Sequence, residues 1–161
     1  YDVCLWLLGP VKVEGGKDGL EQRLDREGHD EYVRVLGRVD HSEVYSYQRR
    51  ADVGLVLVPK RVDGERYYRR GIPTKMIEYM YAELPVVASN TIGIKNYLPR
   101  ECGVRVPSQR TNVQADVIQE LLDNPKKRSQ MGRQGRKHVL KQMSWESESK
   151  TLLEFYNDLT Q

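Results

Sequence analysis

The chain has 161 residues, of which 39% are hydrophobic and 30% are charged, and its formal net charge at pH 7 is +3. This is the length of one ordinary domain with a substantial core, and the composition is not that of a disordered chain. The small positive surplus does not by itself indicate a nucleic-acid partner, and no apolar run approaches the roughly 20 residues of a membrane-spanning helix.

The two cysteines, Cys4 and Cys102, lie in or beside apolar, strand-like runs, and the sequence has no CxxC motif and no Cys/His cluster. A structural zinc site is therefore not expected, and both thiols are predicted to be reduced and buried in a cytoplasmic protein. The chain opens on an apolar strand pattern without an initiating methionine, so we expect it to be a piece of a longer protein.

Short apolar runs alternate with helical patterns along the chain. Strands are expected at residues 3–8, 32–36, 53–58, 86–88 and 102–106. Helices are expected at residues 19–27, after a cap at 40–42, from residue 74, and at 91–98, 112–122, 126–141 and 145–159. This alternation predicts an α/β fold with a Rossmann-like, doubly wound parallel sheet of about five to six strands, followed by C-terminal helices. We expect one domain over residues 1–161.

The segment Tyr67–Asn90 carries the pattern with the most chemical content. Gly71 and Pro73 precede a helix that starts at Thr74. The first-turn amides of a helix lack intrahelical partners, and together with the helix dipole they form an anion site, to which Lys75 adds a positive charge. Glu78 lies one turn further, where a carboxylate can accept two hydrogen bonds from a ribose diol. Phosphate at the helix end and ribose one turn in would fit a nucleoside diphosphate.

The same residues also fit an ordinary junction between a loop and a helix. In that interpretation Glu78 and Lys75 are only an exposed pair three residues apart on a helix surface. The residues alone leave both interpretations open.

Residues 30–158 resemble the C-terminal half of a glycosyltransferase family 4 (group 1) enzyme, one half of a GT-B fold. The matching segments occur in the family's order: YVRVLGRV at 32–39, RADV at 50–53, GIPTKMIEYMYAELPVVAS at 71–89, the strand at 102–106, LLDNP at 121–125, and the pairs Met131-Gly132, Gly135-Arg136 and Ser144-Trp145. The joint pattern is specific, although no single piece would be.

The resemblance implies roles for individual residues. Glu78 matches the second glutamate of the family's E-x7-E motif, which holds the donor ribose. The loop facing the donor sugar and diphosphate matches Gly71, Ile72, Pro73 and Thr74, and the turn that touches the base matches Arg38 and Val39. Thr74 and Lys75 would stabilise the diphosphate leaving group. Position 70 departs from the motif, because Arg70 stands where the family has its first glutamate.

The resemblance further implies a retaining transferase that moves a hexose-type sugar from a UDP-, GDP- or ADP-linked donor to a glycan or lipid-linked acceptor, in cell-surface polysaccharide or glycoconjugate synthesis. The family's N-terminal acceptor domain would be missing, residues 144–161 would form a helix that packs toward it, and this chain alone would be inactive. Half of a GT-B-like sugar-nucleotide epimerase, or a non-catalytic module that binds a nucleotide or a partner, stays open as an alternative.

Two further expectations concern charge. The sequence has no Asp-x-Asp pair, so we expect donor binding without a metal or other cofactor; basic side chains, among them Arg70, and backbone amides would meet the phosphates. His138 lies in a cationic segment with Arg133, Arg136, Lys137 and Lys141. That segment is either a solvated face or a peripheral contact with the inner face of the membrane. No nucleic-acid partner is expected.

Overall fold

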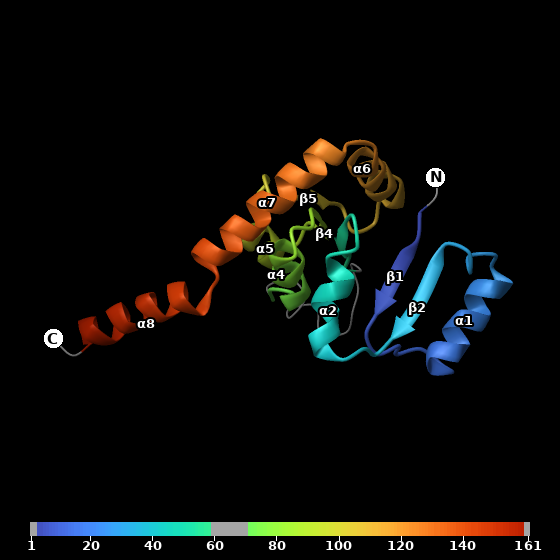
Figure 1. Cartoon of the computed structure of the whole chain (residues 1–161), viewed down its shortest axis with the longest axis horizontal. Helices are drawn as coiled ribbons and strands as arrows, with labels where there is room; N and C mark the ends of the chain where they lie inside the picture. Colours follow the sequence, from blue (N-terminus) through green and yellow to red (C-terminus); the bar gives the residue numbers. More distant parts are fainter. Residues whose placement is uncertain (1–2, 59–70, 160–161) are drawn as a thin grey trace. The chain divides into compact units, whose positions relative to one another are not determined.

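A computed structural model of the chain describes residues 3–58 and 71–159. These residues form two compact units, Tyr1–Val44 and Tyr45–Gln161. The division falls within one helix, α2 (His41–Gln48), and Figure 1 traces the chain through both units. The expectation of one domain over residues 1–161 stays a prediction.

The first unit is a βαβ unit. Strands β1 (Leu5–Leu8) and β2 (Val33–Gly37) pair in parallel, and helix α1 (Gly16–Arg26) connects them. Gly28 ends the helical segment at a φ of +71°, a conformation that a residue with a Cβ adopts only with strain. The prediction that Cys4 is buried is wrong: the residue is exposed, because this end of β1 is uncovered and the neighbouring Leu5 is itself 40% exposed.

The second unit is built on a three-stranded parallel sheet. Its order is β3 (Gly54–Val56), β4 (Val86–Ser89) and β5 (Gly103–Val106), with β4 in the centre and all four of its residues buried. The helices that connect or follow these strands are α4 (Thr74–Tyr81), α5 (Ile92–Tyr97), α6 (Thr111–Asp123), α7 (Pro125–Gln142) and α8 (Trp145–Leu159).

Helices cover both faces of this sheet, as a doubly wound fold requires. Successive residues of a strand point to opposite faces. Val86 and Ala88 join a core cluster with residues from α4, α5 and α7, among them Met76, Met80, Ile94 and Val139. Val87 joins a second cluster with Val106, Leu121 and Met131. The predicted α/β class, parallel pairing and C-terminal helices are therefore confirmed.

Cys102 lies in the first of these clusters and is fully buried, as expected. Burial raises the pKa of its thiol to about 11, with a smaller contribution from Glu101. The thiol therefore stays protonated at neutral pH, which is the state of an unreactive core residue. Among the helices of residues 3–58 and 71–159, none is long and apolar enough to cross a membrane.

Candidate functional site

Helix α4 begins at the predicted residue, and its first turn is open. Pro73 precedes the helix in an extended conformation, and no side chain caps this end among the described residues. The side chains of Thr74 and Lys75 are exposed. Unpaired N–H groups of the first turn and the positive end of the helix dipole therefore face outward, where they can take an anion. Because α4 follows β3 in the chain, this end lies at the carboxyl edge of the sheet, where α/β folds bind ligands.

Glu78 lies one turn into α4 and is half-buried. Its Oε2 accepts a hydrogen bond from Nε2 of Gln48, the last residue of α2, at 3.2 Å. Gln48 is 8% exposed, so the amide is held by its surroundings. One carboxylate oxygen of Glu78 is thus fixed by the protein, while the other has no protein donor within the described residues. A carboxylate held in this way is suited to accept hydrogen bonds from a ligand hydroxyl group.

The other predicted site residues fall into three places. Gly71, Ile72 and Pro73 lie directly before α4, and Ile72 is 36% exposed. Arg38 and Val39 directly follow β2 in the first unit. Arg70 lies outside the described residues. The structure thus brings the helix-start residues and Glu78 together on one element, and the ligand roles of all these residues stay predictions.

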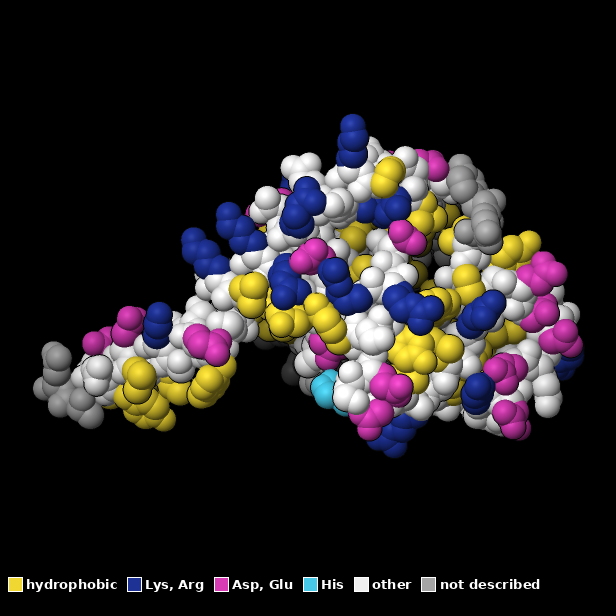
Figure 2. All heavy atoms as spheres, in the orientation of Figure 1, with side chains coloured by type: hydrophobic (Ala, Val, Ile, Leu, Met, Phe, Trp, Pro, Cys, Tyr) yellow, Lys and Arg dark blue, Asp and Glu magenta, His cyan; other side chains and the backbone are white. Residues whose placement is uncertain are grey.

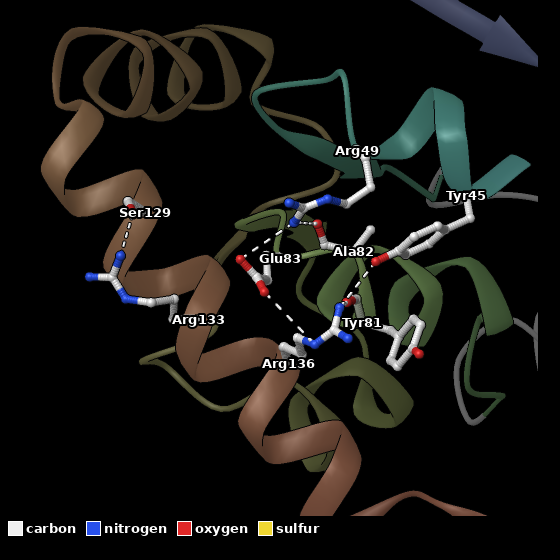
Figure 3. A network of polar contacts seen from close by, with 8 residues as sticks. All are labelled: Tyr45, Arg49, Tyr81, Ala82, Glu83, Ser129, Arg133 and Arg136. Carbon is white, nitrogen blue, oxygen red and sulfur yellow. Dashed lines mark hydrogen bonds and ion pairs between the residues drawn. The ribbon is translucent and has the colours of Figure 1, made fainter.

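Two arginines hold the opposite end of α4 (Figure 3). Arg49 donates from Nη1 to the carbonyl of Ala82 at 3.2 Å, and Arg136 donates from Nη1 to the carbonyl of Tyr81 at 3.0 Å. Both also approach the carboxylate of Glu83, at 3.4 and 3.8 Å. Cations at the C-terminal end of a helix stabilise its unpaired carbonyl groups and its dipole. The network therefore fixes the orientation of α4 and, with it, the direction of its open first turn.

Two aromatic rings complete this network. Arg136 Nη1 also donates to the hydroxyl of Tyr45 at 3.1 Å, and the guanidinium lies 4.6 Å above the centre of the Tyr81 ring. The Tyr45 and Tyr81 rings are 5.6 Å apart. Arg136 thus joins α2, α4 and α7 through one side chain. The sequence places Arg136 in a basic segment and in the family-like pair Gly135-Arg136, but these patterns do not reveal its contacts with α2 and α4.

Ser89 fixes the chain at the entry to the segment 59–70. Its buried hydroxyl accepts from the backbone N–H of Val58 at 2.8 Å and donates to the carbonyl of the same residue at 3.2 Å. The side chain thus continues the pairing of β3 and β4 beyond Val56, where the backbone ladder ends. Ser89 and Gln48 have no local signal in the sequence, because both contact residues about 30 positions away.

The Ser89→Ala substitution is expected to lower the free energy of unfolding by about 2 kcal/mol, because it removes two hydrogen bonds of a buried hydroxyl and leaves the N–H of the half-buried Val58 without its partner. Urea unfolding followed by circular dichroism measures this loss. The Ser108→Ala substitution is a suitable control, since Ser108 makes no side-chain hydrogen bond among those found in the described chain. Equal midpoints for the two variants would contradict a stabilising role for Ser89.

Among residues 3–58 and 71–159, no three His, Cys, Asp or Glu side chains lie close enough together to hold a metal ion. Asp52, at the entry to β3, forms an ion pair with Arg128 at 3.0 Å. That contact assigns the carboxylate a structural role. Donor binding without a metal stays a prediction.

A search of curated proteins matches 71% of this chain, at 28% identity over 114 residues, to a GDP-mannose-dependent monoacylated alpha-(1-6)-phosphatidylinositol monomannoside mannosyltransferase of Corynebacterium glutamicum. The match spans 29% of that protein's length. Among solved structures, sucrose-phosphate synthase from Thermosynechococcus elongatus superposes with a TM-score of 0.78 at 26% identity, over 97% of this chain and 38% of that one.

The fold also matches that of Anabaena HepE in complex with UDP, with a TM-score of 0.78 at 15% identity, over 97% of this chain and 41% of that one. The model of the family described as glycosyl transferases group 1 matches residues 2–138, which is most of the chain and includes all of α4. By this match, the chain belongs to the glycosyl transferases group 1 family.

Proposed function

We propose that this chain is the C-terminal, donor-binding half of a glycosyltransferase of family 4. It would bind a nucleoside diphosphate sugar and would act with an N-terminal acceptor domain. The observation that carries the proposal is the geometry of α4, whose open, basic first turn is followed one turn later by a carboxylate that Gln48 holds in place. The UDP bound to a protein of the same fold and the GDP-mannose dependence of a sequence relative support it.

The chemistry of the proposed reaction centres on the leaving group. Negative charge that develops on the departing diphosphate would meet the amides and dipole of α4, the hydroxyl of Thr74 and the ammonium of Lys75. Glu78 would position the donor through its ribose and would neither donate nor accept a proton in the reaction. Retention of configuration and a hexose-type sugar belong to this proposal, as does binding without a metal.

The acceptor belongs to the same proposal. A glycan or a lipid-linked molecule would receive the sugar in cell-surface polysaccharide or glycoconjugate synthesis, in the cytoplasm and with peripheral contact at the inner face of the membrane. The chain alone is expected to transfer no sugar, because the proposed acceptor half is not part of it. Helix α8, whose large apolar side chains Leu153 and Leu159 are 62% and 65% exposed, would pack toward that half.

Calorimetric titration of the chain with UDP, GDP and ADP tests the donor site. One of the three is expected to bind with a submillimolar dissociation constant, because the base contacts distinguish nucleotides that share the same diphosphate and ribose. Adenosine without phosphates is the control, and it is expected to bind far more weakly, since the helix end would have no anion to take. If none of the three bound, a non-catalytic module would replace the donor-binding half as the conclusion.

A further inference from the structure

The charged side chains of helix α7 are all positive. It contains seven lysine and arginine residues and no aspartate or glutamate. The chain as a whole has a net charge of only +3, so this helix concentrates positive charge that the rest of the molecule balances. The seven cations are Lys126, Lys127, Arg128, Arg133, Arg136, Lys137 and Lys141.

Three of these cations are used within the protein. Lys127 pairs with Glu120 at 2.6 Å, Arg128 with Asp52 at 3.0 Å, and Arg136 with Glu83 at 3.8 Å. All three basic side chains are partly buried. The other four are exposed and have no acidic partner among the described residues: Lys126, Arg133, Lys137 and Lys141.

The four unpaired cations lie on one face of α7. They are 7, 4 and 4 residues apart in the sequence. At about 100° per residue, this spacing places them within an arc of about 80°, and at 1.5 Å per residue they extend over about 22 Å. Figure 2 shows the dark-blue side chains in a row along α7. We call these four residues the basic stripe.

Apolar side chains accompany the C-terminal part of the basic stripe. Leu140 is 52% exposed and lines a surface hollow together with Arg133, Lys137 and Lys141. The acidic group in the lining of this hollow is Glu83, which Arg49 and Arg136 already neutralise. Trp145, the first residue of α8, is 73% exposed. An exposed leucine beside lysines, with an exposed tryptophan four residues after Lys141, is typical of segments that enter the interface of a lipid bilayer.

We propose that the basic stripe, with Leu140 and Trp145, binds a membrane surface rich in anionic phospholipid. Lysines and arginines near such a surface are attracted to its headgroups, and the apolar side chains add burial at the acyl boundary. A nucleic acid would use the charge but would give Leu140 no apolar environment, whereas an anionic bilayer offers both. The inference rests on the membrane contact within the proposed function and not on nucleotide binding, so vesicle binding and UDP titration can fail independently.

Flotation of the whole chain with vesicles tests this surface. We expect binding to vesicles of phosphatidylcholine with about one third phosphatidylglycerol, little binding to pure phosphatidylcholine, and loss of binding in high salt. The double variant Lys137→Gln/Lys141→Gln should bind at least about tenfold more weakly, because two of the four unpaired charges are removed. Leu140→Ser should also weaken binding, and it leaves every charge in place.

The matched control is Lys12→Gln/Lys95→Gln, which removes two exposed lysines outside α7 and should bind vesicles as the parent chain does. Circular dichroism checks that each variant is folded. Equal vesicle binding by the stripe variant and this control would overturn the proposal, as would equal binding to neutral vesicles. Binding to single-stranded RNA that the stripe variant loses, without any vesicle binding, would overturn it in favour of a nucleic-acid surface.

Discussion

Replacing Glu78 with alanine is expected to weaken binding of the preferred nucleoside diphosphate by about tenfold to a hundredfold, because hydrogen bonds to a charged group contribute about 1.5–3 kcal/mol. The effect should appear in the dissociation constant measured by calorimetry. It should be the same for a nucleotide and for the corresponding sugar nucleotide, since the proposed contact is to the ribose. Glu101→Ala, which removes an exposed carboxylate elsewhere in the same unit, is the control.

Gln48 gives this experiment an internal comparison. The Gln48→Leu substitution keeps a side chain of similar size and removes the donor to Glu78 Oε2. The carboxylate remains but is no longer held, so a smaller loss of nucleotide affinity is expected, of about three- to tenfold. The double variant Glu78→Ala/Gln48→Leu should bind as weakly as Glu78→Ala alone, because Gln48 acts through Glu78.

Unchanged nucleotide affinity in Glu78→Ala would remove the ribose contact from the proposed site. A loss in Gln48→Leu that adds fully to the loss in Glu78→Ala would show instead that Gln48 acts on the fold or on the ligand directly. Either result leaves the family unchanged, since the family match extends over residues 2–138 and not over these two positions alone.

The local patterns of the sequence predict most elements of the fold. The start of α4 at Thr74 follows from Pro73, because a proline disfavours helical backbone in the residue before it. The spacing of Met76 and Met80, which are both fully buried, indicates the apolar face of the helix. Helix α2 begins as its cap predicts, since Asp40 accepts a hydrogen bond from the amide of Ser42 at 2.9 Å. These signals lie within one or two turns of the chain.

Element ends that depend on distant residues are less accurate in the prediction. The sequence predicts the third strand over residues 53–58, but it covers only Gly54–Val56, because the amide of Val58 bonds to the side chain of Ser89 instead of joining the backbone ladder. The first helix begins three residues before the predicted position, since Gly15 adopts a left-handed conformation ahead of it. The contact with Ser89 has no signal in the sequence around Val58, because the two residues are 31 positions apart. The start of α1 does have a local signal, since Gly15 directly precedes it.

The residues of the candidate site also divide into those that local sequence patterns predict and those that depend on distant contacts. Thr74, Lys75 and Glu78 could be placed together because helical spacing alone puts them on one element. Gln48 and Arg136 could not be found, since their contacts to α4 join residues 30 and 55 positions apart. Paired and unpaired lysines and arginines in α7 also look alike in the sequence, and only the positions of Glu83, Asp52 and Glu120 distinguish them.

Gly132 makes the closest approach between α7 and the segment that follows α4. A Cβ at this position would overlap the carbonyl oxygen and carbon of Glu83. Glu83 cannot move away easily, because it holds a φ of +62° and its carboxylate lies between two arginines. It is also the only non-glycine residue with a positive φ in the described part of the chain.

The Gly132→Ala substitution is therefore expected to destabilise the protein by about 3 kcal/mol, even though alanine favours helix formation by about 1 kcal/mol. For a chain of this size, that loss corresponds to a melting temperature lower by about 10 °C. Differential scanning calorimetry measures both quantities.

Gly135→Ala, on the same helix, is the matched control. Its Cβ would lie 3.2 Å from the Cβ of Met80, a contact that a few tenths of an ångström relieve. The helix preference of alanine offsets that cost, so a change within about 1 kcal/mol is expected. Equal stability of the two variants would contradict the close packing of α7 on the backbone at Glu83. The expected result is a large loss of stability in Gly132→Ala alone. It would show that this glycine is needed for the contact between α7 and the segment that follows α4.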